Sequence, residues 1–436
     1  MHEASACEAG DGMTDRLDGV LARIDADAAL WSDLAAVCAL GGRFAGTDSE
    51  ARARDFLAGR LHDACRAAPA AHRIDYQGWR RGEGALEIQG ARGPALPCVP
   101  LVRSPPTPPG GLEAEVVDLG RGDAADVERC AAEIPGRIVL VRHEYMFAAG
   151  SIHRRRKYGW AMEAGAAGFL IASHLPGELP VTGSSGAGPD GDGIPAAGLS
   201  AESAARLTAA GEGACPRVRL RIGAEAGPAA TANLIADLPG HGPGTVVLCA
   251  HLDGHHLAES AMDNGTGLAV ALAVARALAP CRGRLARGLR VALFSIEEWA
   301  LAGSARYVEE LDRAERDAIG LVLNLDSVAG APRLTALTSG FPAAESFLLE
   351  AASGAGMALG VHRPLMANSD HYSFAIQGIP AVRLVAGFGE PDSNLKYVLT
   401  PADTLDRIAP AELKSAARLA ATLALRACEA PELALR

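Results

Sequence analysis

From about residue 228 onward, short and wholly apolar runs alternate with segments in which apolar residues recur at helical spacing. The runs TVVLCA, LRVALFSI and IGLVLNL predict strands that are covered on both faces, since they leave no polar side. The segments GLAVALAVARALA and SARYVEEL predict helices, and a last helix is expected from about 410 to 428. This alternation predicts an α/β fold whose mostly parallel or mixed sheet is flanked by helices.

The first half of the chain has a different pattern. Residues 14–66 predict helices, with a glycine-rich break at GGRFAGT. From about residue 85 short strand-like runs such as EAEVVDLG and RIVLVRH are separated by turns rich in Pro and Gly. We therefore expect three parts: an N-terminal helical part of the catalytic domain over 1–84, an inserted β-rich domain over 85–226, and the catalytic α/β domain over 227–436.

Composition narrows the class of protein. A chain of 436 residues is too long for one ordinary domain, and 49% hydrophobic with 4% aromatic residues predicts cores of Ala, Val and Leu. The net charge is −11, and no basic stripe occurs, so we expect no nucleic-acid partner. The single basic cluster, HRRRK at 153–157, is interpreted as a solvated helix face.

The cellular location is predicted from signal, membrane-span and cysteine patterns. The first residues lack the apolar core of a secretory signal. The sequence contains no uncharged apolar stretch of 18 residues, so we expect no membrane span. Nine cysteines are scattered along the chain without a C-x-x-C pair. This spacing is typical neither of a disulfide framework nor of a zinc-thiolate site, so we expect reduced thiols and a cytoplasmic location.

Polar clusters follow three of the predicted buried strands. These are His251 with Asp253, Glu297 with Glu298, and Asp326. Ligands of open α/β sheets bind outside the carboxyl ends of the strands, so we expect these side chains at one edge. Asp263, just before a predicted helix, can return to that edge. Carboxylates packed together need a cation, and imidazole with carboxylate suits zinc, so a metal site is predicted.

Several motifs resemble the zinc exopeptidases of the M28 family, which includes many aminopeptidases and the glutamate carboxypeptidases: HLDG…AMDNGTG, FSIEEWALAGS, NLD and SDHYSF. The stretch GGRFAGTDSEARARDFL resembles the element that opens that fold. The set PGRIVLVRH…AMEAGAAGFLIAS…IPAAGLS resembles the protease-associated (PA) domain that is often inserted in it. The motifs come in the family's order and cover most of the chain.

The resemblance implies a role for each polar residue. It implies two Zn²⁺ ions, or only one, held by His251, Asp326, Glu298 and a bridging Asp263. Asp253 would orient the His251 ring, and Glu297 would be the general base that takes a proton from the attacking water. The resemblance also implies a cis peptide bond between Asp263 and Asn264.

One ligand of the family is missing. The element KYVLTPADTLD resembles the family's C-terminal HT-x-x-DT element, but Leu399 stands where the histidine belongs. His371, the last histidine of the chain, is the first candidate substitute, and His255 and His256 are others. Alternatively the enzyme uses one metal ion, as the glutaminyl cyclases of this superfamily do, or it has lost hydrolysis, as the transferrin-receptor relatives have.

The leading hypothesis is a metal-dependent hydrolase of peptide or related amide bonds, above all an aminopeptidase. Tyr372 and Tyr397 are candidate donors to a developing oxyanion, and His255 and His256 are candidate substrate contacts. The alternatives are a mononuclear amide hydrolase or cyclase acting on a specialised metabolite, and a non-catalytic binding homologue. The expected partner is a peptide or small amide substrate, without nucleic acid or membrane, and a homo-oligomer is left open.

Overall fold

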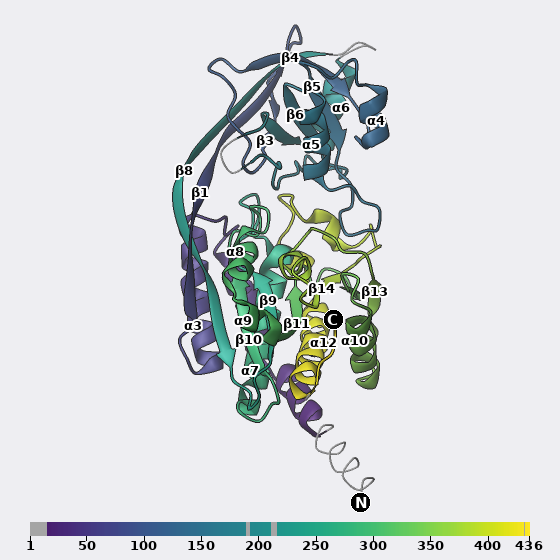
Figure 1. The fold of residues 1–436 in the computed structure, drawn as a ribbon. Helices are drawn as coiled ribbons and strands as arrows, with labels where there is room; N and C mark the ends of the chain where they lie inside the picture. Colours follow the sequence, from purple (N-terminus) through teal and green to yellow (C-terminus); the bar gives the residue numbers. More distant parts are fainter. Residues whose placement is uncertain (1–14, 189–191, 211–215, 431) are drawn as a thin grey trace, which may run out of the picture.

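Two long strands connect the two lobes of the molecule (Figure 1). The computed structural model describes residues 15–188, 192–210, 216–430 and 432–436. Strands β1 (Ala70–Ile88) and β8 (Arg217–Leu238) pair antiparallel along most of their length and run from the body to a smaller lobe, which we call the insert lobe (residues 89–216). The expected domain limits at 84/85 and 226/227 thus fall inside paired strands.

The body contains the sheet that the apolar runs predict. Its strand order is β13-β12-β14-β11-β9-β10-β8. The four central strands are parallel, whereas β8 runs antiparallel to β10 and β12 runs antiparallel to β14, so the sheet is mixed as expected. The strands are β9 (Thr245–His251), β10 (Gly288–Phe294), β11 (Ile319–Leu325), β12 (Leu334–Leu337), β13 (Gly360–His362) and β14 (Ala381–Ala386).

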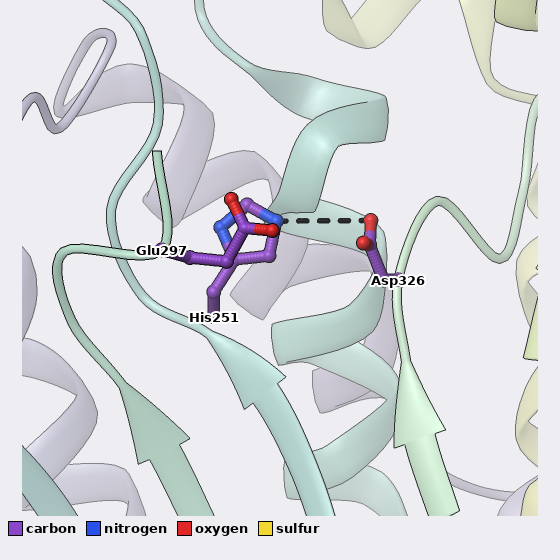
Figure 2. A group of neighbouring side chains, drawn as sticks. All are labelled: His251, Glu297 and Asp326. Atoms are coloured by element: carbon purple, nitrogen blue, oxygen red, sulfur yellow. Dashed lines mark ion pairs between the residues drawn. The ribbon is translucent and has the colours of Figure 1, made fainter. Parts of the chain in front are cut away.

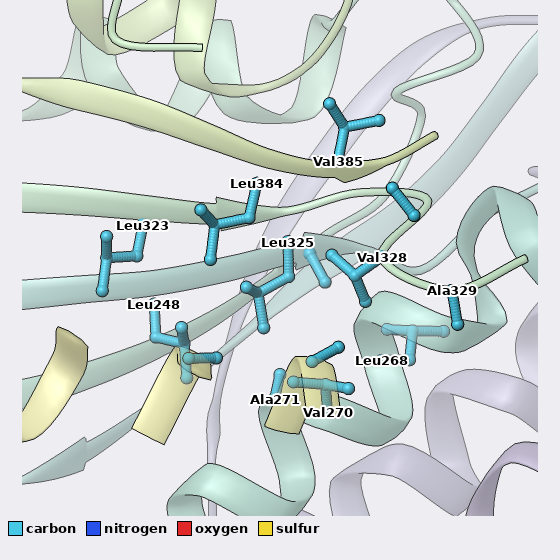
Figure 3. Close-up of a cluster of buried hydrophobic side chains, with 14 of the residues drawn as sticks. Leu248, Leu268, Val270, Ala271, Leu323, Leu325, Val328, Ala329, Leu384 and Val385 are labelled. Atoms are coloured by element: carbon cyan, nitrogen blue, oxygen red, sulfur yellow. The ribbon is translucent and has the colours of Figure 1, made fainter. Parts of the chain in front are cut away.

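Helices flank this sheet, and one of them forms the centre of the core. In α7 (Thr266–Leu278) every residue except Arg276 is buried. Leu268, Val270 and Ala271 lie beside the leucines of the sheet (Figure 3), and α12 (Pro410–Glu429) packs against α7. The other helices of the body are residues 15–25, α2 (Ala29–Ala39), α3 (Asp48–Cys65), α8 (Ala302–Glu310), α9 (Arg313–Ala318), α10 (Pro342–Gly354), α11 (His371–Ala375) and α12 (Pro410–Glu429).

The helical stretch Ala261–Cys281 is long and apolar enough to cross a membrane, but 83% of its most apolar window is buried inside the fold. Burial on all sides by sheet and helices accounts for its apolar composition, since a helix without a solvent face needs no polar stripe.

The strands of the insert lobe continue the sheet of the body, because β4 pairs with β8. Strands β4 to β7 pair in parallel in chain order, and part of their apolar side chains form a buried cluster separate from the main core. The elements are β2 (Leu96–Pro97), β3 (Val99–Pro100), β4 (Leu112–Asp118), α4 (Ala124–Arg129), β5 (Ile138–Arg142), α5 (Arg154–Glu163), β6 (Gly168–Ala172), β7 (Ala196–Leu199) and α6 (Ala201–Ala209). Figure 1 shows this lobe above the body, with α5 on the side that faces it.

Candidate metal centre

The polar side chains that follow β9, β10 and β11 meet at one edge of the sheet, as the strand pattern predicts. Figure 2 shows His251, Glu297 and Asp326 at the ends of these neighbouring strands. One potential ligand atom of each lies within 4.8 Å of those of the other two. Nε2 of His251 lies 3.0 Å from Oδ1 of Asp263 and 3.7 Å from Oδ1 of Asp326. Four predicted site residues therefore share one cluster.

The His251 ring is oriented by a backbone carbonyl. Its Nδ1 lies 2.9 Å from the carbonyl oxygen of Asp253, whereas the nearest carboxylate oxygen of Asp253 is 3.9 Å away. Because a carbonyl only accepts, Nδ1 carries the hydrogen and Nε2 faces the carboxylates. The carboxylate of Asp253 instead accepts the backbone N–H groups of Glu297, at 3.0 Å, and Glu298, at 3.2 Å. Asp253 thus positions the turn that carries both glutamates.

Asp263 is held by residues far away in the sequence. The peptide bond between Asp263 and Asn264 is cis, as expected. Asp403, which belongs to the ADT part of the C-terminal element, accepts the backbone N–H groups of Met262 and Asp263 at 2.7 and 3.3 Å. The Asn264 amide donates to the carbonyl of Leu325 at 2.8 Å. The sequence pattern alone indicates no role for Asp403, although the residue lies in the C-terminal element KYVLTPADTLD.

Asp326 is fixed by a serine and an arginine. The Ser369 hydroxyl donates to its Oδ2 at 2.6 Å, and Nη2 of Arg383 lies 3.1 Å from the same atom. Burial alone raises the pKa of Asp326, but Arg383 and His251 outweigh it and hold this pKa below its ordinary range. Arg383 lies in an apolar strand, so no sequence signal marked it as part of the site.

The two glutamates are buried next to other acids. Burial, together with neighbouring carboxylates, raises the pKa of Glu297 well above its usual value and that of Glu298 to about 8. Oε1 of Glu298 has no hydrogen-bond partner among the described residues. Carboxylates in this state bind protons when no cation compensates them. The donor set around His251, Asp263 and Asp326 fits a cation that prefers imidazole and carboxylate ligands.

A cavity of about 40 Å³ lies at this cluster, and a larger pocket of about 660 Å³ adjoins it between the lobes. Asp263, Glu297, Glu298, Asp326 and Leu399 line the small cavity. Arg154 and Arg155 of the insert lobe line both spaces. The interpretation of residues 153–157 as a solvated helix face is therefore wrong, because packing against the body and β5 buries Arg154 and Lys157.

The predicted substitute ligands lie elsewhere. His371 is buried at the start of α11, without a hydrogen-bond partner for its ring among the described residues, and does not line the small cavity. His255 is also buried without a ring partner, and burial lowers its pKa well below the usual value. His256 packs edge-on against Phe44, with ring centres 4.5 Å apart, and lines a separate pocket beside β1.

The two predicted tyrosines have different surroundings. Tyr372 lines the larger pocket between the lobes. Tyr397 is covered by the guanidinium of Arg407, 4.0 Å from the ring centre, and lines neither the small cavity nor the larger pocket. The structure thus leaves Tyr372 in reach of a substrate in the pocket and gives Tyr397 a packing role.

Sequence comparison places two known modules on the chain. Residues 233–424 match the family model of peptidase family M28, and residues 100–207 match that of the PA domain. The probable leucine aminopeptidase 2 of Aspergillus fumigatus is 27% identical over 322 residues, which are 71% of this chain and 61% of that protein. Leucine aminopeptidase 2 of Trichophyton rubrum is 30% identical over 255 residues, which are 58% of this chain and 48% of that protein. The chain thus spans about half to three fifths of the length of these relatives.

Solved structures share the fold over nearly the whole chain. A peptidase M28 precursor from Shewanella amazonensis has a TM-score of 0.80 at 22% identity, covering 98% of both chains. The aminopeptidase from Aneurinibacillus sp. strain AM-1 has a TM-score of 0.72 at 23% identity, covering 96% of this chain and 98% of that one. The solved structures thus show the same fold, and the two model matches show that residues 233–424 belong to peptidase family M28, with a PA domain at residues 100–207.

Proposed function

We propose that this chain is a metal-dependent hydrolase of peptide or related amide bonds that acts as an aminopeptidase. The observation that carries the proposal is the meeting of His251, Glu297 and Asp326 within 4.8 Å at the ends of adjacent parallel strands. Relatives named leucine aminopeptidase support it, as does membership of a peptidase family.

We propose Zn²⁺ as the metal, with His251, Asp263 and Asp326 as its ligands. One imidazole nitrogen and carboxylate oxygens form a ligand set typical of catalytic zinc, and Nε2 of His251 is free for this role because Nδ1–H is bonded to a carbonyl. When bound, the ion supplies positive charge that polarises the scissile carbonyl and makes a water molecule more acidic.

Glu297 is proposed as the general base. Its carboxylate lies in the cluster, and its backbone is fixed by Asp253. Burial raises the pKa of Glu297, and a raised pKa brings a carboxylate closer to the pH at which it both accepts and returns a proton. Glu297 takes the proton of the attacking water and delivers it to the leaving amine, whereas Arg383 and Ser369 keep Asp326 in place.

The pocket between the lobes is proposed to hold the substrate. Its volume of about 660 Å³ falls within the roughly 300–1,000 Å³ that is usual for small-molecule sites. Apolar side chains such as Met146, Trp160 and Leu365 line it together with Tyr372. These walls suit an apolar side chain next to the scissile bond.

The test compares Glu297→Gln with Glu309→Gln, a matched change of an exposed glutamate on α8. Hydrolysis of leucine p-nitroanilide should fall by about two to four orders of magnitude for Glu297→Gln, with unchanged zinc content, and should stay unchanged for Glu309→Gln. An N-acetylated substrate, which lacks the free amine, should be a poor substrate of the unaltered chain. Full turnover by Glu297→Gln would remove Glu297 from the mechanism.

We also propose that the chain works in the cytoplasm, as expected from its scattered cysteines. The seven described cysteines are free and buried, which supports a role in packing. Fractionation of source cells with a specific antibody tests this location, and recovery outside the cell would contradict it. Size-exclusion chromatography tests the oligomeric state that is left open.

A further inference from the structure

The residues present do not complete a second metal site of the kind that the family resemblance implies. Asp263 and Glu298 are in place, but Leu399 is only 2% exposed and lines the same cavity. A leucine side chain has no lone pair to offer a metal ion. His371 does not line this cavity, and neither does His255 or His256.

A guanidinium enters this cavity from the insert lobe. Arg154, the first residue of α5, is 5% exposed and lines the cavity with Glu298, Asp263 and Leu399. Its Nε donates to the carbonyl of Ser184 at 2.7 Å, and no other hydrogen bond of this side chain is found within the described residues. Its two terminal nitrogens are therefore free to interact with a group in the cavity.

The fold makes room for Arg154. A Cβ on Gly183 would lie 2.1 Å from Nη2 of Arg154 and 2.5 Å from its Cζ. The backbone at Gly183 has φ +103°, a conformation that favours glycine. The glycine and the neighbouring Ser184 carbonyl thus hold the guanidinium at the cavity wall.

The negative charges that act on Arg154 come from the carboxylates that line the small cavity. Burial lowers the pKa of Arg154 to about 10, and Glu298 opposes this most strongly, followed by Asp263 and Glu297. Arg154 is therefore charged at neutral pH. Arg81 of β1, which is half-buried, adds a second cation: the charge of Glu298 acts on it too, and its Nη1 has no hydrogen-bond partner among the described residues.

We propose that the guanidinium of Arg154 takes the place of the second metal ion, so that the chain binds one metal ion, at His251, Asp263 and Asp326. This inference rests on the proposed metal-dependent function. A fixed cation that lines the same cavity as Glu298 and Asp263 both compensates these acids through space and repels a divalent ion, while Leu399 removes the ligand that such an ion would need. The insert lobe thereby contributes a charged group to the reaction centre of the body.

One histidine in the cavity offers the competing explanation. His153 lines the cavity, and its Nδ1 accepts the backbone N–H of Arg155 at 3.1 Å, which leaves only Nε2 for a metal. The charged groups that act on His153 are cations, Arg155 and Arg154, together with His143. A metal ion at Nε2 of His153 would have to share the small cavity with the guanidinium groups of Arg154 and Arg155, and their positive charge disfavours it.

The experiment counts zinc per chain by elemental analysis after equilibrium dialysis of the full chain against excess Zn²⁺. We expect one zinc in the unaltered chain, in Leu399→His and in Arg154→Met, and two in the double variant that combines both changes. The matched control replaces Arg156, which lies on the same helix but is exposed and stacked over Trp160 at 5.1 Å. Leu399→His with Arg156→Met should still bind one zinc.

Two zinc ions in the unaltered chain would overturn the proposal, and a fall to one in His153→Ala would then assign the second ion to His153. A second zinc ion in Leu399→His, where Arg154 is still present, would show that Leu399 and not Arg154 excludes the ion. That result would also overturn the proposal. A double variant that binds only one zinc ion, with unchanged thermal unfolding, would likewise overturn the proposal. Failure of the proposed function looks different, because then the unaltered chain binds no zinc and His251→Ala changes nothing.

Discussion

Nη2 of Arg383 lies 3.1 Å from Oδ2 of Asp326, and both side chains are almost fully buried. Arg383 lies in β14, and Asp326 directly follows β11, the neighbouring parallel strand. An arginine inside an apolar strand thus fixes a carboxylate at the edge of the sheet, where the proposed metal ligand is needed.

Breaking this pair should destabilise the chain. Arg383→Met leaves the Asp326 carboxylate buried without its cation, so we expect the free energy of unfolding of the metal-free chain to fall by about 3 kcal/mol. Urea denaturation measures it. Arg290→Met is the control, because Arg290 pairs with the half-exposed Asp237 and such a pair contributes about 0–1 kcal/mol. Equal losses for both variants would contradict the special role of Arg383.

Asp253→Asn should impair catalysis more than substrate binding. The Asp253 carboxylate accepts two backbone N–H groups, from Glu297 and Glu298, and an asparagine keeps only one acceptor oxygen. We expect kcat to fall about tenfold or more, with a smaller change in KM, because the base is misplaced while the pocket is intact. Steady-state kinetics test this, and an unchanged kcat would show that the turn holds its shape without Asp253.

Gly42→Ala should be disruptive because the glycine presses against the loop after β9. A Cβ at this position would lie 2.1 Å from the carbonyl oxygen of His255 and 2.6 Å from Cα of His256. Overpacking of this kind costs roughly 1–3 kcal/mol, and the shift would reach the turn before Asp263. Gly59→Ala is the matched control: it lies in α3 with open space around its Cβ, and should stabilise by up to about 1 kcal/mol. Thermal unfolding distinguishes the two, and similar melting temperatures would refute the steric argument.

Stability should fall in mild acid, in part through His143 of the insert lobe. Burial lowers the pKa of the His143 ring well below its usual value, and the nearby cations Arg154 and Lys157 and the ring of His174 lower it further. The folded chain therefore keeps His143 neutral, and the unfolded chain binds a proton below about pH 6.5. The contribution of His143 is present above that pH and is lost as the pH falls.

The measurement compares unfolding free energies of the unaltered chain and His143→Asn between pH 7 and pH 5. Below about pH 6.5, the unfolding free energy of the variant should fall less steeply with pH than that of the unaltered chain. The two slopes should differ by up to about 1.4 kcal/mol per pH unit. Comparing slopes removes any constant loss caused by the substitution. Identical slopes would show that His143 does not titrate on unfolding in this range.

The first half of β1 is among the strands that the sequence pattern did not predict. Residues 70–84 contain three glycines and several charged side chains, which is not typical of a strand. Pairing with β8 stabilises this part of the strand, because β8 runs antiparallel beside β1 from Ala70 to Ile88. At Gly82 a Cβ would lie 2.7 Å from the backbone of Gly223, so the two strands approach each other closely there.

The sequence by itself determined the central parallel strands of the body and the edge at which their polar residues meet. Continuous apolar runs indicate strands buried on both faces, and parallel strands bring their carboxyl ends to one edge. This is why His251, Glu297 and Asp326 were predicted together. Only the tertiary structure showed that Arg383 and Asp403 hold them, and that Arg154 reaches them from the insert lobe. Local periodicity indicates which residues of one element are buried. Contacts between the lobes join residues that are far apart in the sequence, and such packing buries Arg154 although it belongs to a basic cluster.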